Sequence, residues 1–213
     1  MFKSKAALAA LIPLSLAACS TPTGTVTEGG VAAVRSACPA VAIPAATGDI
    51  TLFNPEGSRD ASAIDVVASI TNLRSTCSET GETIVTNVTF DVQAQRRDGR
   101  GAREVVLPYF AVAVQGGTQV QSKSVSRVGL RFADGELRAS SRGSATGQVS
   151  RAAATLPEDI RRQITRERKP GDPSAAIDPM ADPAVREAVR RASFEVLVGF
   201  QLTQDQLAYN ATR

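Results

Sequence analysis

The sequence predicts a mainly β fold, an immunoglobulin-like Greek-key β-sandwich with a short helical insertion and a C-terminal helical turn. From residue 38 onward, apolar and polar residues alternate with a period of two, as in strands that bury one face. Turns rich in Gly, Asp and Pro separate these segments. The last alternating segment, 194–202, follows a region without alternation, so the sheet is completed from the far end of the chain, which is typical of Greek-key sandwiches.

The chain begins with the features of an export signal. Lys3 and Lys5 precede an uncharged apolar stretch of about 13 residues, which is shorter than the roughly 20 that a transmembrane helix needs. The tetrapeptide Leu16-Ala-Ala-Cys19 that ends this stretch resembles a bacterial lipobox. The resemblance implies a signal peptide over residues 1–18 and a lipid attached to Cys19. An ordinary secretory signal, cleaved just before the cysteine, is the alternative.

Residues 19–37 are small, polar and rich in Gly and Thr, so they bury too little surface to fold and are predicted to form a flexible tether. Ser20, directly after the cysteine, resembles the sorting residue of outer-membrane lipoproteins. We therefore expect the lipid to anchor a β-sandwich domain, residues 38–210, to the outer membrane with the domain facing the periplasm.

The strands follow from the alternation. The predicted strands are 39–43, 49–53, 64–71, 84–95, 105–115, 118–128, 129–132, 137–149 and 194–202. Segment 84–95 is the clearest, with Thr86 as the only polar residue on its inward face. Pro108 lies within 105–115 and cannot donate a ladder hydrogen bond, which predicts an edge strand or a bulge.

Residues 155–192 break the alternation and are predicted to form a helical insertion on the surface. Thr155 and Glu158 have the spacing of a capping box, and we expect helices over 158–169 and 184–192, each with little apolar stripe.

A second capping-box spacing follows the last strand, between Thr203 and Gln206. It predicts a terminal helical turn in which Leu207 and Tyr209 pack under the sheet.

Composition excludes several classes of function. The chain contains no histidine, which excludes Ser-His-Asp and Cys-His catalysis and histidine-based metal sites. Aromatic residues make up 4% and tryptophan is missing, which disfavours stacking surfaces for nucleic acid bases. Removing residues 1–18 takes away Lys3 and Lys5 and no acid, so the formal charge falls from +3 to +1 and gives no argument for a nucleic acid partner. We expect no enzyme and no cofactor.

Two motifs resemble ligand sites only superficially. Asp172, Asp178 and Asp182 could offer carboxylates to Ca²⁺, but each precedes a proline and is better interpreted as a turn initiator, so we expect no metal site. Gly143-Ser-Ala-Thr-Gly147 lacks both the lysine of a phosphate loop and the order of a nucleophile turn.

Two cysteines lie in the predicted domain, Cys38 and Cys77. An oxidising envelope favours a disulfide between them, and closing a loop of about 40 residues would stabilise the fold by about 4 kcal/mol in the chain-entropy model. Two buried free thiols are the alternative, because the sequence does not show that the two residues approach each other.

The insertion carries the densest basic patch. Its members are Arg161, Arg162, Arg166, Arg168, Lys169, Arg186, Arg190 and Arg191. The patch could contact anionic lipid or a polyanionic polymer. Glu158 and Glu187 stand four residues before an arginine, which favours ion pairs on solvated helices instead.

Several stretches resemble one family. They are Cys38-Pro-Ala-Val-Ala-Ile43, Asn72-Leu-Arg-Ser-Thr-Cys77, Leu107-Pro-Tyr-Phe-Ala-Val112, Val198-Gly-Phe-Gln-Leu-Thr203 and Leu207-Ala-Tyr-Asn210. Together they look like uncharacterised bacterial envelope lipoproteins with an immunoglobulin-like domain. The resemblance implies the compartment and the sandwich and adds no reaction.

Two functions are compatible with these observations. We expect an accessory or structural module that docks onto an envelope protein assembly through a sheet edge or the basic insertion. The alternative is a non-catalytic binding protein for a small or polyanionic envelope ligand.

Overall fold

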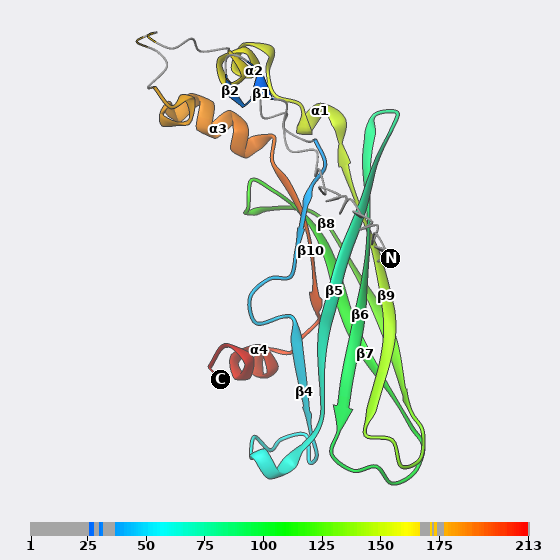
Figure 1. Cartoon of the computed structure of the whole chain (residues 1–213). Coiled ribbons are helices and arrows are strands. Elements are labelled where there is room, and N and C mark those ends of the chain that lie inside the picture. The colour runs from blue at the N-terminus through cyan, green and yellow to red at the C-terminus, as the bar shows by residue number, and fades with distance from the viewer. Residues whose placement is uncertain are drawn as a thin grey trace, which may run out of the picture.

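The computed structural model describes residues 26–27, 30–31, 37–166, 171, 173 and 177–212. Two four-stranded sheets face each other as a sandwich (Figure 1). The β7 sheet contains, in spatial order, β3 (Ala40–Ala42), β10 (Phe194–Phe200), β7 (Arg103–Gln115) and β8 (Gln119–Phe132). The β6 sheet contains β4 (Asp49–Phe53), β5 (Ile64–Thr80), β6 (Thr83–Arg96) and β9 (Arg138–Ser150). The predicted mainly β sandwich is therefore confirmed.

The strand order departs from the chain order in two places. β9 pairs with β6, although the β7–β8 hairpin lies between them in sequence and belongs to the other sheet. β10 inserts between β7, to which it is antiparallel, and β3, to which it is parallel. Such pairing between strands that are distant in sequence is typical of Greek-key topology, and it places β10, near the end of the chain, in the centre of a sheet.

The core forms where the inward faces of both sheets meet. Its largest fully buried apolar side chains are Phe90, Leu107, Leu130, Phe132 and Phe200. Burying a side chain of this size contributes about 1.5–3 kcal/mol. Thr86 is the inward polar exception in β6, as predicted, and is 1% exposed.

Two glycines of β9 leave room for core side chains. A Cβ at Gly143 would overlap the ring of Phe90, its neighbour in β6 of the same sheet, and one at Gly147 would overlap Cγ2 of Val196 in the opposite sheet. The stretch from Gly143 to Gly147 is thus part of a strand whose glycines serve packing. This placement argues against a phosphate loop or a nucleophile turn.

Pro108 lies in an interior strand, so the prediction of an edge strand is wrong for β7 as a whole. The last residue of β10, Phe200, pairs with Tyr109, and Pro108 lies one position beyond this end. The Pro108 carbonyl accepts a hydrogen bond from Gln201 N at 2.9 Å. β7 tolerates the proline because its ladder with β10 has already ended there.

Short helices form the insertion between β9 and β10, which projects from one end of the sandwich (Figure 1). They are α1 (Arg151–Ala154), α2 (Glu158–Thr165), η3 (Pro179–Ala181) and α3 (Pro183–Arg191). Contrary to expectation, α2 and α3 share a small apolar core of Ile160, Val185 and Ala188. The insertion is a folded helical unit because these side chains cover one another.

The first predicted capping box is wrong. The N-cap of α2 is Pro157 and makes no side-chain cap, while the Thr155 hydroxyl donates to the Arg151 carbonyl at 2.8 Å. Thr155 instead continues the hydrogen bonding of α1, so it is not available to α2.

The second capping box is confirmed at α4 (Gln204–Thr212). Gln206 N donates to Thr203 Oγ1 at 3.2 Å, and Thr203 N donates to Gln206 Oε1 at 2.9 Å. Tyr209 packs edge-on against Phe53 with ring centroids 5.2 Å apart. Leu207 is 42% exposed, so its predicted packing is wrong.

Two further elements are short. The 3-10 helix η1 (Ala61–Ala63) precedes β5. The strands β1 (Val26–Thr27) and β2 (Gly30–Val31) pair with each other inside the predicted tether. Most of the tether lies outside the described residues, so its predicted flexibility stays a prediction.

Candidate functional site

The outer edge of β8 is unpaired among the described strands. β8 pairs with β7 alone and ends the β7 sheet. Residues 119–127 are exposed on both faces of the strand, with Val120 at 61% and Val125 at 56%. A free strand edge presents a row of N–H and C=O groups that can pair with another chain.

The inward residues of β8 explain why residues 119–127, the open half of the strand, are exposed on both faces. In the closed half, residues 128–132, the side chains of Val128, Leu130 and Phe132 point inward and are buried. In the open half the corresponding inward positions are Ser122 and Ser124, opposite Ala113 and Ala111 of β7. These small side chains do not fill the space between the sheets, whereas the large ones do.

A pocket of about 440 Å³ occupies that space. Its lining includes Ala111, Ala113, Ser122, Ser124, Gly147 and Val196. Nearby, the Tyr109 hydroxyl of β7 donates to the Ser144 carbonyl of β9 at 2.7 Å, which ties the two sheets together. In Figure 1 the tips of the β5–β6 and β7–β8 hairpins point apart at this end. We call this pocket, together with the free edge of residues 119–127, the β8 slot.

The β8 slot carries positive charge. Residues 119–132 contain Lys123, Arg127 and Arg131 and no acidic residue. Arg131 pairs with Glu104 at 3.3 Å, and Lys123 Nζ lies 5.4 Å from the centre of the Phe110 ring. Within the described part of the chain, neither Lys123 nor Arg127 forms an ion pair. Two cations are thus available to a bound partner.

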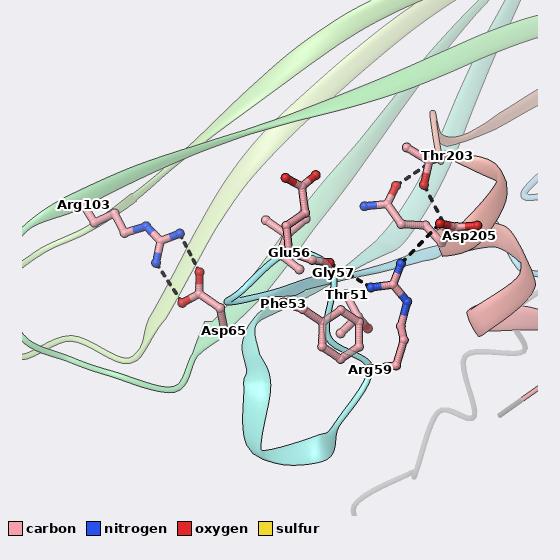
Figure 2. Close-up of a pocket in the computed structure, with 11 residues that line it drawn as sticks. Thr51, Phe53, Glu56, Gly57, Arg59, Asp65, Arg103, Thr203 and Asp205 are labelled. Atoms are coloured by element: carbon pink, nitrogen blue, oxygen red, sulfur yellow. Dashed lines mark hydrogen bonds and ion pairs between the residues drawn. The ribbon is translucent and has the colours of Figure 1, made fainter.

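A second pocket, of about 610 Å³, lies at the opposite end of the sandwich beside α4 (Figure 2). Arg103 forms a bidentate pair with Asp65 at 2.8 and 2.7 Å, and this pair raises the pKa of Arg103. Arg59 lies over the Phe53 ring at 5.1 Å and 3.7 Å from an Asp205 oxygen. The charged groups of this pocket therefore largely satisfy one another.

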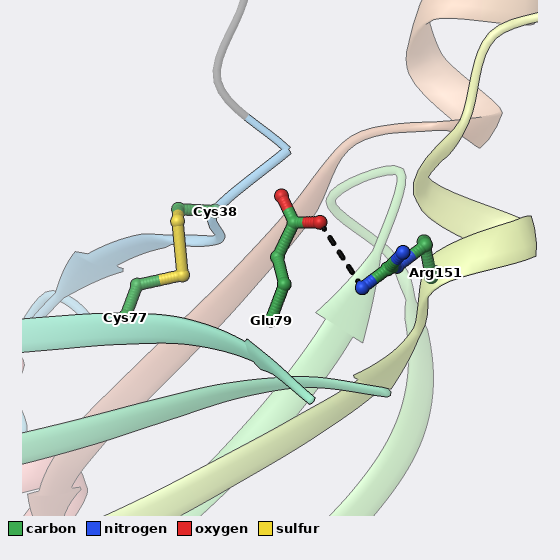
Figure 3. The surroundings of a disulfide bond; sticks show 4 residues. All are labelled: Cys38, Cys77, Glu79 and Arg151. Carbon is green, nitrogen blue, oxygen red and sulfur yellow. Dashed lines mark ion pairs between the residues drawn. A yellow bond between two sulfur atoms is a disulfide. The ribbon is translucent and has the colours of Figure 1, made fainter. Parts of the chain in front are cut away.

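The predicted disulfide between Cys38 and Cys77 is confirmed, with the two Cα atoms 6.0 Å apart (Figure 3). It joins the segment before β3 to β5 and so ties the β7 sheet to the β6 sheet. Glu79, two residues further along β5, pairs with Arg151 of α1 at 3.3 Å. Both links fasten the end of the sandwich from which the insertion projects.

The basic patch is largely paired. Arg161 and Arg162 lie 2.5 and 3.9 Å from Glu158, while Arg190 and Arg191 lie 2.8 and 3.3 Å from Glu187. The hydrogen bond from Arg190 lowers the pKa of Glu187.

The other members of the patch contribute less. Arg186 donates to the Met180 carbonyl at 3.3 Å, and Arg166 follows the end of α2. Arg168 and Lys169 lie outside the described residues. Exposed pairs of this kind support the interpretation as a solvated surface.

Two of the three aspartates that precede proline act as helix caps. Asp178 accepts from Met180 N at 2.9 Å, and Asp182 accepts from Ala184 N at 2.8 Å. Asp172 lies outside the described residues. No group of three or more His, Cys, Asp and Glu side chains in the described part of the chain is placed to hold a metal ion.

The sequence did not reveal the structural role of Arg96, which is 2% exposed at the end of β6. Its guanidinium donates to the carbonyls of Glu136, Gly101, Gly99 and Ala133 at 2.6–2.8 Å. It thereby fixes the β6–β7 and β8–β9 loops to each other. The only sequence signal is its inward position in the alternation of β6, two residues before the dipeptide Asp98-Gly99, which is typical of tight turns.

Cys19 and the predicted signal peptide lie outside the described residues. No described helix has the length and apolar character needed to span a bilayer. No family model matches the chain, and no curated protein or solved structure matches it.

Proposed function

We propose that this protein is a lipid-anchored, periplasm-facing accessory module of the outer membrane that docks onto an envelope protein assembly. The partner adds an extended segment to the edge of β8. One observation carries the proposal, namely that nine consecutive residues of β8, 119–127, are exposed on both faces at a sheet edge that no other described strand covers. Strand addition of this kind is a recurring mode of peptide recognition in which backbone hydrogen bonds supply much of the affinity.

Rigidity of the surrounding frame supports docking. The Cys38–Cys77 disulfide and the Tyr109–Ser144 hydrogen bond hold the two sheets on either side of the slot. A preformed edge loses little conformational entropy when a strand is added to it. The β8 slot is thus prepared to bind without a rearrangement of the domain.

A non-catalytic role agrees with the chemistry of the side chains. The chain has no histidine to act as a general base, and Arg103, Asp65, Arg59 and Asp205 of the second pocket pair with one another.

Binding of a small ligand is the second candidate, and the pocket in Figure 2 is the observation that favours it. A ligand there would have to compete with the ion pairs that are already formed. No such competition arises at β8, where Lys123 and Arg127 have no acidic partner among the described residues.

Photo-crosslinking in intact cells tests the docking function. A photoreactive residue at Val125, which lies on the outer face of the free edge and does not line the pocket, should give one adduct of defined mass and fixed stoichiometry. Gln93 is the matched control, because it is also exposed but lies in β6, which is paired on both sides. Adducts of equal yield at both positions, or none at Val125, would contradict docking through β8.

Lipid attachment has a separate test. Labelled fatty acid should enter the wild-type protein, and a Cys19→Ser variant should lose both the label and the association with membranes. An unlabelled wild-type protein would refute the anchor without bearing on the β8 slot.

A further inference from the structure

We propose that the segment bound at the β8 slot is an extended strand in which acidic residues alternate with aliphatic ones. The aliphatic side chains enter the pocket, and the acidic side chains face Lys123 and Arg127. This inference rests on the proposed docking function and specifies the chemistry of the partner.

The outer face of β8 determines the charge of the partner strand. Lys123 and Arg127 are paired across β7 with Val112 and Pro108, so both lie on the outer face of the sheet. An added strand places every second side chain beside this face, because successive side chains of a strand alternate. Opposite charges on neighbouring strands stabilise the pairing, and like charges oppose it. Acidic residues are therefore favoured at the outward positions.

The inner face determines the other half of the pattern. The floor of the pocket is formed by Ala111, Ala113, Gly147 and Val196, all of which are apolar and buried. Ser122 and Ser124 lie at its rim and leave about 440 Å³ between the sheets. Aliphatic side chains fill such a space favourably, since each Å² of apolar surface removed from water stabilises the complex.

Charge also argues against a second copy of this chain as the occupant. Two β8 edges that pair with each other would bring the Lys123 and Arg127 of both copies together. The stretch 119–132 contains no acidic residue that could separate these cations. A partner of complementary charge is thus favoured over self-association.

Synthetic peptides test this chemistry on the full mature chain in detergent. The probe is acetyl-Val-Glu-Val-Glu-Val-Glu-Val-amide with a fluorescent label, compared with the corresponding Val-Lys peptide. A third peptide has the composition of the first but groups its residues as Glu-Glu-Glu-Val-Val-Val-Val. We expect the Val-Glu peptide to bind at least ten times more tightly than either control and to slow amide hydrogen exchange in residues 119–127.

A charge-reversed variant supplies the decisive comparison. Lys123→Glu combined with Arg127→Glu should reverse the preference, so that the Val-Lys peptide binds more tightly. The matched control, Arg161→Glu combined with Arg162→Glu, makes the same change in net charge on the insertion and should leave the preference unchanged. All four side chains are exposed, so neither variant disturbs the core.

The outcomes separate the two proposals. Equal binding of the Val-Glu and Val-Lys peptides, or a preference that survives the charge reversal at β8, refutes the acidic–aliphatic strand. If the Val125 crosslink persists in that case, docking through β8 stands with a partner of different chemistry. If peptide binding and the crosslink are both missing, both proposals fail.

Discussion

The two halves of β8 both pair with β7, yet one half is buried on its inward face and the other is exposed to solvent. From Val128 to Phe132 the inward residues are large and the sheets are closed, whereas from Gln119 to Arg127 the strand is exposed on both faces. The backbone pairing with β7 continues through both halves. The size of the inward side chains therefore decides where the sandwich closes and where it stays open for a partner.

The closed half is also fixed at its end by Arg96. Its guanidinium donates hydrogen bonds to four backbone carbonyls, and none of its described hydrogen bonds goes to an acidic side chain. A buried cation of this kind is stable only while all its hydrogen bonds are kept. No comparable anchor lies along the open half of β8 among the described residues, and the Cys38–Cys77 disulfide and the Tyr109–Ser144 hydrogen bond hold the two sheets there.

Removing Arg96 should produce the largest loss of stability. We expect Arg96→Met to lower the free energy of unfolding by about 4 kcal/mol or more, because one buried guanidinium makes all four hydrogen bonds that hold the two loops together. Chemical denaturation followed by circular dichroism measures the change. Arg142→Met, at an exposed ion pair, is the control and should lie within about 0.5 kcal/mol of the wild type. A similar small effect at Arg96 would show that water replaces its hydrogen bonds.

Exchanging residue size between the two halves tests the comparison directly. Leu130→Ser should destabilise the protein by about 3–4 kcal/mol, because it removes a fully buried side chain and buries a hydroxyl. Ser124→Leu, on the same face of the same strand, should change stability by no more than about 0.5 kcal/mol and should weaken binding of the Val-Glu peptide. Equal costs for the two substitutions would mean that the halves do not differ in packing.

Removing the disulfide should loosen the sandwich at the end where β8 is open. Replacing both Cys38 and Cys77 by Ser is expected to cost about 2–4 kcal/mol, because the unfolded chain regains the freedom of a long loop. Hydrogen exchange should increase first in β3 and in the end of β5 nearest to Cys77. Mass measurement without reductant provides the control, since two free thiols in the exported wild type would refute the pairing.

Gly147 lies where β9 borders the slot, and its replacement should have a moderate effect. Gly147→Ala is expected to cost about 1–3 kcal/mol, because the new Cβ overlaps Val196 in the fully packed floor. Gly57→Ala is the matched control, since a Cβ there meets no atom within 4 Å. Thermal unfolding of both variants provides the measurement. An unchanged Gly147→Ala variant would indicate that the floor of the slot can move.

The smallest expected effect concerns the loop beside Arg96. Hydrogen bonds from Arg100 lower the pKa of Asp98 to about 2 from its ordinary value of 3.8. The ionised form is stabilised in the folded state, so its contribution is present above about pH 4 and is lost as the pH falls through 2. NMR titration of the Asp98 carboxyl measures the midpoint, which should return toward 3.8 in an Arg100→Gln variant. A wild-type midpoint near 3.8 would contradict the pairing.

Much of the β architecture could be predicted from local patterns. The alternation in 84–95 matches β6, and that in 194–202 predicted a last strand that completes a sheet from the far end of the chain, as β10 does. Segments 118–128 and 129–132 are one continuous strand, β8. Gly129 has a low β-propensity, which suggested a break, but the pairing of β8 with β7 continues through it. Segment 64–71 extends as β5 to Thr80, since the polar residues of its second half are still paired with β6.

The candidate site was harder to predict. A sheet edge was expected to mediate docking, but local alternation does not identify which strand ends a sheet. The serines of β8 resemble those of any exposed strand, and their significance appears only when Ala111, Ala113 and Gly147 are seen to face them across the gap. The basic patch stood out in the sequence, yet Glu158 and Glu187 pair with most of its described arginines.

The sequence by itself determined the fold class, the strands with clear alternation and the exclusion of histidine chemistry, and it offered Cys38 and Cys77 as disulfide partners whose approach only the tertiary structure shows. These properties depend on residue type and on spacing along the chain. Tertiary structure alone decided the neighbour of each strand, the burial of Arg96 and the opening beside β8. Such properties arise from contacts between residues that are distant in sequence. Whether a side chain fills the space between the sheets depends on the size of the side chains that face it from the other sheet.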